Sequence, residues 1–234
     1  SEQPLAFLDH HLKTGNSLVG SDIEEIEELE TEGGNGGENA TLADFGIARK
    51  GTIEQLMRIY KDFIAIKNQD LADVKEMEAK YDEFEQNKLR QRLEAMTNVH
   101  TAEQFGCDGI PSDAYKRMAS SLEDESDWKE IAENSWFQTA QIWAEESRYF
   151  HWSLEFPEVL YDQGGEAISD PGFDAVIGNP PYVRVQNLNH DLIDYLKEQY
   201  QVAYRRIDIS LMFFEIATEL CKMSARASYI SSLQ

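Results

Sequence analysis

The stretch FDAVIGNPPY, residues 173–182, decides the fold class of this 234-residue chain. Its first six residues, Phe173 to Gly178, form an apolar run of strand length that only Asp174 interrupts. A short run of this kind is typical of a strand in the middle of a parallel sheet, where both faces are covered. We therefore predict an α/β fold class in which this strand is buried and apolar on both faces.

The residues directly after this strand are suited to hold a planar amino group. Ligands gather at the carboxyl ends of strands in open α/β sheets. The side-chain oxygen of Asn179 accepts one hydrogen bond, Pro180 presents a carbonyl aimed by its fixed ring, and Tyr182 offers a flat face for stacking. Two acceptors on a conjugated amino group direct its lone pair toward an incoming methyl group. A rigid turn is the alternative interpretation, because Asn-Pro is common in turns.

Helical patterns fill most of the chain before this strand. Apolar residues at three- and four-residue spacing from Thr52 to about Met96 predict two long helices that turn around 67–70. An aromatic-rich helix is predicted from Asp127 to about Phe150. The other predicted elements are helices over 191–200 and 209–223, with Asp208 as a helix N-cap, and a buried strand over 227–231.

Charge and composition limit the classes of function. Lys plus Arg is 21 and Asp plus Glu is 44, so the net charge is −23. This argues against a self-sufficient nucleic-acid binder, because phosphates need a basic face, although a fragment of one could have its basic surface elsewhere. Cys107 and Cys221 lack paired spacing, so neither a disulfide framework nor a metal site is predicted. The acidic run from Ser21 to Asn39 is predicted to be a solvated loop, and no membrane span is indicated, so we expect a cytoplasmic protein.

Several stretches resemble one methyltransferase family. FDAVIGNPPYVR, residues 173–184, resembles the amino-methyltransferase motif of S-adenosylmethionine-dependent N6-adenine DNA methyltransferases. LDHHLKTGNSLVG (8–20), RYFHWSLEFPEVL (148–160) and IDISLMFFEIATEL (207–220) resemble the subgroup found in type IIG restriction-modification enzymes and BREX-type phage-defence methylases. The resemblance is weak from Ala40 to about Ser147.

The resemblance implies a Rossmann-like methyltransferase sheet with a large α-helical insertion. It divides the chain into a cofactor-side core segment with the acidic loop (1–39), the helical insertion (40–150), and a core segment with the target-base motif (151–234). The family's glycine-rich loop for the methionine part of the cofactor would lie before Ser1, and its DNA-recognition domain after the last strand. We therefore expect an internal piece of a larger enzyme, inactive alone, that meets double-stranded DNA through other domains of the polypeptide.

The resemblance also assigns site residues. The target adenine would be held, after it leaves the duplex, by Asn179, Pro180, Pro181 and Tyr182. Asn16, with Ser17 beside it, falls where the family places a polar side chain near the adenine of S-adenosylmethionine. A simple turn residue is the alternative for Asn16.

Two other classes of function stay open. Amino-methyltransferases that act on a glutamine side chain of release factors or on guanine in ribosomal RNA share Asn-Pro-Pro-Tyr. Roughly 160 residues separate the cofactor-side segment from that motif here, which is far longer than an ordinary loop and favours the DNA group. The second alternative is a non-catalytic scaffold or partner-binding segment of a degenerate methyltransferase.

Overall fold

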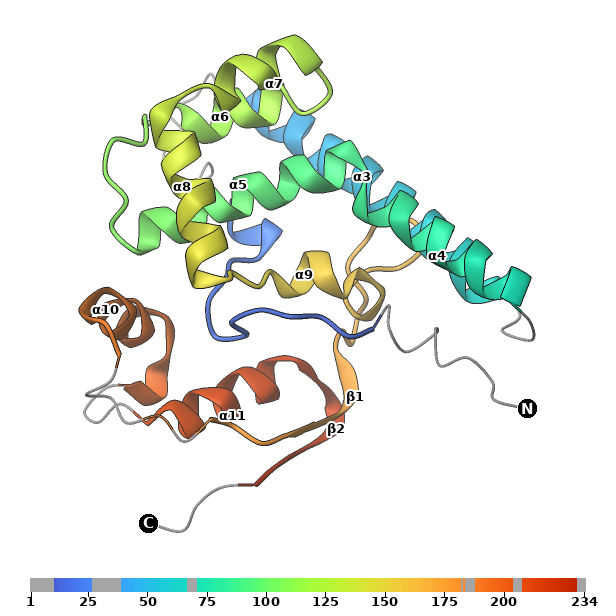
Figure 1. The fold of residues 1–234 in the computed structure, drawn as a ribbon, viewed down its shortest axis with the longest axis vertical. Coiled ribbons are helices and arrows are strands. Elements are labelled where there is room, and N and C mark those ends of the chain that lie inside the picture. Colours follow the sequence, from blue (N-terminus) through green and yellow to red (C-terminus); the bar gives the residue numbers. More distant parts are fainter. Residues whose placement is uncertain are drawn as a thin grey trace.

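The computed structural model describes residues 11–26, 39–66, 71–181, 183, 188–203 and 208–230. In this part of the chain, helices pack beside a small parallel sheet (Figure 1). The helices are α3 (Asn39–Ala65), α4 (Leu71–Glu85), α5 (Lys88–Gln104), α6 (Ala114–Ser120), α7 (Glu125–Ala132), α8 (Ser135–Ser147), α9 (Trp152–Glu155), α10 (His190–Gln199) and α11 (Ile209–Glu219). The strands are β1 (Phe173–Gly178) and β2 (Cys221–Tyr229), and 3-10 turns span Pro157–Val159 (η1) and Gln201–Ala203 (η3).

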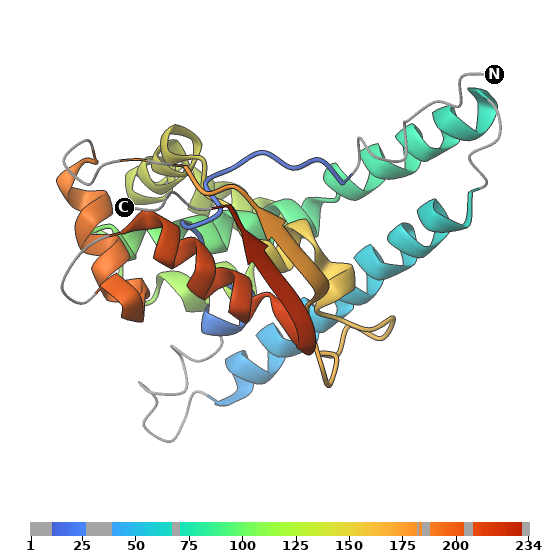
Figure 2. The same cartoon turned by 90° about the horizontal axis from the view of Figure 1, so that it is seen from below.

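The two strands are parallel, and α10 and α11 lie between them in sequence. Parallel neighbours need such a crossover connection, which is usually helical. Gly178 lies opposite Tyr229 in the register, and the Tyr229 ring lies 6.0 Å from that of Phe214 on α11. Figure 2 shows α11 alongside the strand pair. This arrangement is compatible with the predicted α/β class.

The prediction that these strands are buried is wrong for the described chain. Ile177 on β1 is 85% exposed, and Met223 on β2 is 98% exposed. The physical reason is that the sheet has only two strands within the described ranges, and no described layer packs over these two side chains. The second strand also starts earlier than predicted, at Cys221, so residues 221–223 are strand and not helix.

The helical region contains more elements than the periodicity predicts. The stretch predicted as two helices contains α3, α4 and α5, and the predicted turn at 67–70 lies outside the described residues. Asn87 starts α5 by accepting hydrogen bonds from the backbone N–H groups of Leu89 and Arg90, both at 3.0 Å. The long helix predicted over 127–150 is likewise divided, into α7 and α8.

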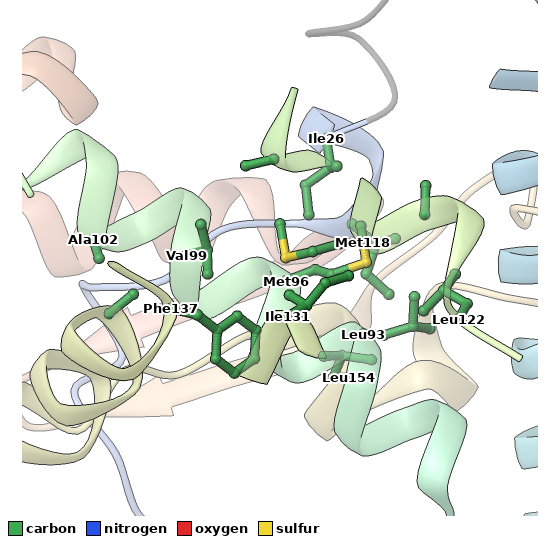
Figure 3. Packing of buried hydrophobic residues seen from close by; sticks show 14 of the residues in the cluster. Ile26, Leu93, Met96, Val99, Ala102, Met118, Leu122, Ile131, Phe137 and Leu154 are labelled. Carbon is green, nitrogen blue, oxygen red and sulfur yellow. The ribbon is translucent and has the colours of Figure 1, made fainter. Parts of the chain in front are cut away.

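The larger hydrophobic core lies among α5, α6, α7 and α8 (Figure 3). Met96, Met118 and Phe137 are buried at its centre, and Leu154 of α9 joins them. Ile26 enters the same core from the N-terminal side. The core therefore draws on all three predicted segments, 1–39, 40–150 and 151–234, whose boundaries stay a prediction.

The described part of the acidic run is not the solvated loop that was predicted. Residues 23–26 form a helical turn in which Ile23 is fully buried and Ile26 is 2% exposed. The two isoleucines are three residues apart, so they share one helical face while the acidic residues take the other. Residues 27–38 lie outside the described residues.

A second, smaller core joins the N-terminal segment to the α10–α11 region. Leu18 and Val19 pack there with Tyr195, Tyr200 and Met212. In the described residues, no helix has the length and apolarity needed to cross a membrane. The same residues include no group of three or more His, Cys, Asp or Glu side chains placed to hold a metal ion.

Candidate functional site

The loop after β1 follows the carboxyl end of the strand, as the sequence predicts. Asn179 is exposed, Pro180 is buried and Pro181 is exposed. The carbonyl of Pro181 accepts a hydrogen bond from the N–H of Val183 at 3.0 Å, which closes a tight turn. Tyr182 lies outside the described residues.

Packing between the two strands explains the glycine that precedes this loop. A Cβ atom at Gly178 would overlap the ring of Tyr229 on the neighbouring strand. The carbonyl of Gly178 also accepts a hydrogen bond from the N–H of Ile230 at 3.1 Å. The strand pair therefore extends to the residue before Asn179 and fixes where the loop begins.

The predicted cofactor-side residues lie in a segment that runs beside residues 148–151. The N–H of Asn16 donates to the carbonyl of Arg148 at 2.7 Å, and Asn16 forms an isolated parallel bridge with Tyr149. Farther along, the N–H of Phe150 donates to the carbonyl of Val19 at 2.8 Å. Two stretches about 130 residues apart in sequence are thus held together by backbone hydrogen bonds.

The side chain of Asn16 remains available for a ligand. It is half-buried, and its Oδ1 receives one long hydrogen bond, 3.4 Å from the N–H of Leu18. No hydrogen bond within the described residues uses its Nδ2. An amide can both donate to and accept from the edge of a purine, so Asn16 has the chemistry that recognition of an adenine requires.

Ser17 lines a cavity of about 190 Å³ between the N-terminal segment, α10 and the end of α11. Trp152 donates from Nε1 to the Ser17 carbonyl at 3.2 Å and forms part of the cavity wall with Tyr195. Ligand pockets usually measure roughly 300–1,000 Å³. This cavity can therefore accept part of a nucleoside-sized cofactor and not the whole. Asn16, next to Ser17 in sequence, and Asn179 are both absent from its lining.

Carboxyl groups give this cavity a negative lining. Asp22 and Glu219 both line it, and burial raises the pKa of each carboxyl. Neighbouring carboxylates, Glu24 for Asp22 and Glu215 for Glu219, raise these pKa values further. The lining therefore suits a cationic or hydrogen-bond-donating group better than an anion.

The structure adds residues to the site that the sequence analysis did not single out. A Cβ atom at Gly20 would overlap the carbonyl oxygen of Phe150, so this position requires glycine. His151 is buried and bonds to the backbone of Ser21. The aromatic-rich stretch 148–160 was the available signal, but its pairing with the N-terminal segment could not be read from the sequence.

Comparisons with known proteins agree with the resemblance. A family model described as Eco57I restriction-modification methylase matches residues 52–234. The match includes the loop at 179–182 and begins after Asn16 and Ser17. The type II methyltransferase M.BstVI of Geobacillus stearothermophilus is 35% identical over 82 residues, which is 35% of this chain and 14% of that relative. The chain thus spans a small part of the relative's length, and no solved structure matches it significantly.

Proposed function

Because this chain belongs to the Eco57I restriction-modification methylase family, we propose that it forms part of an adenine-specific DNA methyltransferase. The enzyme transfers a methyl group from S-adenosylmethionine to the N6 amino group of adenine in double-stranded DNA. Its role is restriction-modification or defence against phage. Other domains of the same polypeptide supply the basic surface that DNA requires, since this chain carries a net charge of −23.

The observation that carries this proposal is the position of Asn179 and Pro180 directly beyond the carboxyl end of β1. The Asn179 side chain is exposed, whereas the Pro180 ring is buried and anchors the loop. A polar acceptor on a rigid turn at a strand end is the arrangement expected of a binding site and not of a packing contact.

The chemistry needs the adenine outside the duplex, because N6 is not accessible to a methyl donor within the stack. S-adenosylmethionine, when bound, supplies an electrophilic methyl group. Asn179 Oδ1 and the Pro180 carbonyl accept the two amino hydrogens and turn the nitrogen lone pair toward that methyl group. Tyr182 stacks on the extruded base. The nitrogen–carbon bond forms, the sulfur–carbon bond breaks, and the methylated amino group then releases one proton to water.

Asn16 and Ser17 are proposed to contact the adenine part of the cofactor. The amide chemistry of Asn16 and the cavity beside Ser17 support this assignment. The size of the cavity, about 190 Å³, is consistent with residues outside this chain holding the rest of the cofactor.

The open sheet supports a larger architecture. Parallel sheets are normally covered on both faces, and Ile177 and Met223 are exposed in the described strand pair. We propose that β1 and β2 belong to a Rossmann-like methyltransferase sheet completed by other parts of the polypeptide. Residues 40–150 are then a helical insertion between core segments 1–39 and 151–234.

The test is methyl transfer by the full-length enzyme. Labelled S-adenosylmethionine and duplex DNA are incubated with the wild type and with Asn179→Ala, and the DNA is digested to nucleosides. We expect N6-methyladenine from the wild type and a rate about 100- to 1,000-fold lower from Asn179→Ala, because one preorganised acceptor is lost. Cofactor affinity should change little.

Asn189→Ala is the matched control, because Asn189 is a surface helix cap that accepts from the N–H of Leu192 at 2.8 Å. Its rate should stay near that of the wild type. Methylated cytosine as the only product would show that the target base is not adenine. Absence of labelled DNA, with label transferred instead to added RNA or to a protein glutamine, would contradict DNA as the substrate. Near-normal transfer by Asn179→Ala would show that the loop is only a turn.

A further inference from the structure

His151 connects the N-terminal segment to the helical region. The side chain is 4% exposed and lies between Ser21 and Asn98 of α5. Its Nδ1 is 3.1 Å from the backbone nitrogen of Ser21, and its Nε2 is 2.8 Å from Oδ1 of Asn98. One imidazole therefore contacts both the helical core and the segment that carries Asn16.

The hydrogen-bond partners of His151 are fixed by a chain of amides that starts at a backbone carbonyl. The carbonyl of Ala95 can only accept, so the amide nitrogen of Gln141 faces it at 3.0 Å. The Oε1 of Gln141 then accepts from Nδ2 of Asn98 at 2.8 Å. This orientation turns Oδ1 of Asn98 toward His151, where it must accept a hydrogen bond.

The proton of the neutral imidazole accordingly lies on Nε2, and Nδ1 accepts from the N–H of Ser21. The carbonyl of Ser21 is also 3.1 Å from Nδ1. A proton on Nδ1 could donate to that carbonyl, but Nε2 and Asn98 Oδ1 would then be two facing acceptors. Burial lowers the pKa of His151 to about 4, so the imidazole is neutral at neutral pH.

The bond from Ser21 holds one end of the segment that begins at Asn16. Further fixed points are the Asn16 N–H on the Arg148 carbonyl and the Val19 carbonyl on the Phe150 N–H. Side chains also hold the segment: the carbonyls of Ser17, Leu18 and Gly20 accept hydrogen bonds from Trp152, Tyr200 and Tyr195, respectively. Residues 15–21 contain no regular helix or strand, so the position of Asn16 and Ser17 depends on bonds of this kind, and the bond to His151 is the one that ties the segment to Asn98 of α5.

We propose that His151 is a positioning residue for the cofactor: by accepting from Ser21, it holds the Asn16–Ser21 backbone so that Asn16 meets the adenine of S-adenosylmethionine. This inference rests on the proposed function, because that function gives Asn16 its ligand. The helical region then controls cofactor affinity through Gln141, Asn98 and His151.

Two substitutions at His151 separate its two hydrogen bonds. Asparagine places its oxygen near the position of Nδ1 and can still accept from Ser21, whereas glutamine reaches the Nε2 position and serves Asn98 instead. Dissociation constants for S-adenosylmethionine are measured by calorimetry on the full-length enzyme, and KM for duplex DNA is measured in parallel. We expect His151→Gln to weaken cofactor binding about tenfold and His151→Asn to stay within about threefold, with KM for DNA unchanged in both.

His100→Asn is the matched control. His100 is buried like His151, but it lies on α5, where its ring contacts Tyr115 and faces Glu25 and makes no bond to Ser21. Its cofactor affinity should equal that of the wild type. If the His151→Gln protein does not fold, the Gln141→Leu variant is measured in its place. Gln141 is only half-buried, and its loss frees Asn98 to rotate, so we expect a severalfold weaker affinity.

Equal affinities for the two His151 variants, unchanged affinity in Gln141→Leu, or an equal loss in His100→Asn would overturn the positioning role. A wild type that binds S-adenosylmethionine but methylates no adenine would contradict the proposed function and leave the affinity comparison valid. A wild type that does not bind S-adenosylmethionine would overturn both.

Discussion

Gly20 is the single residue whose size most constrains the candidate site. A Cβ atom there would overlap the carbonyl oxygen of Phe150, which is rigid backbone and cannot turn aside. Gly20→Ala must therefore push the N-terminal segment away from residues 148–151. We expect a loss of about 1–3 kcal/mol in the free energy of unfolding, as for other overpacked sites. Thermal melting of the full-length protein measures this loss as a lower Tm.

Gly51→Ala, in contrast to Gly20→Ala, is expected to stabilise the protein. Gly51 lies inside α3, and a Cβ atom there would meet nothing within 4 Å. Alanine is favoured over glycine in a helix interior by roughly 0.8–1.0 kcal/mol, so this variant should melt at a higher temperature than the wild type. A higher Tm for Gly20→Ala as well would mean that the segment is not packed against Phe150.

His151 gives the stability of the protein a specific pH dependence. Burial, and then the charges of Arg90 and His100, lower its pKa from 6.5 to about 4 in the folded state, although the Ser21 backbone opposes this. Between these two values the unfolded chain binds a proton that the folded chain does not. Stability due to the neutral imidazole is therefore complete above pH 6.5 and is lost as the pH falls toward 4, by up to about 1.4 kcal/mol per pH unit.

The comparison that isolates this effect is the wild type against His151→Asn, melted at several pH values from 7 to 4.5. Buried carboxyls with raised pKa values, such as Asp22 and Glu158, act in the opposite direction. They are common to both proteins and cancel in the difference. The stability gap should shrink in the acid range, and parallel curves would contradict a neutral, buried His151.

Among the elements, α5 depends on its cap more than α8 does. The Asn87 side chain accepts from two backbone N–H groups of α5, whereas the equivalent residue of α8, Asn134, makes no such cap bond. Asn87→Ala should therefore cost about 0.5–2 kcal/mol in the free energy of unfolding. Asp113→Ala is the control, because Asp113 stands at the N-cap of α6 and its side chain makes no cap bond. It should cost clearly less, and equal losses on melting would contradict the capping role of Asn87.

The same cap shows how far the sequence predicts the elements. The apolar spacing located the helical region but did not locate the break before α5, which starts at the Asn87 cap. Helix α10 was located to within one residue at each end, because its apolar face is regular. Asp208 was confirmed as a cap, accepting from the N–H of Ser210 at 3.0 Å. Local sequence patterns therefore predicted helices and a capping residue, but they did not predict the position at which the chain breaks between α4 and α5.

The sequence predicted only those parts of the candidate site whose residues are neighbours along the chain. The loop at 179–181 follows its strand as expected, because strand and loop are adjacent in sequence. The pairing of Asn16 with Tyr149 joins residues far apart along the chain, and no pattern in either stretch specifies the other. The coupling of His151 to Ser21 was missed for the same reason.

At the scale of the whole molecule, the described chain is a packed helical body joined to an incompletely covered sheet. Buried residues of the larger core come from α3, from α5 to α9 and from both flanking segments. At the sheet, by contrast, α11 packs against β2, while Ile177, Met223 and Ile230 are exposed. The apolar sequence of β1 is suited to a buried strand, and within the described residues no layer covers Ile177.

This contrast gives the last prediction, a test of the proposed Rossmann-like sheet. If further layers cover β1 in the full-length enzyme, Ile177→Asp places an unpaired carboxylate in an apolar contact and should cost about 3 kcal/mol or more in the free energy of unfolding. If Ile177 stays 85% exposed, only the poor strand propensity of aspartate remains, about 1 kcal/mol.

Ile142→Asp on α8 is the control, because Ile142 is 53% exposed on the helical body, and surface changes there cost about 0.5 kcal/mol. Melting of the three full-length proteins decides the question: a large, selective loss in Ile177→Asp supports a covered sheet, and two small losses would show that β1 and β2 remain an open pair.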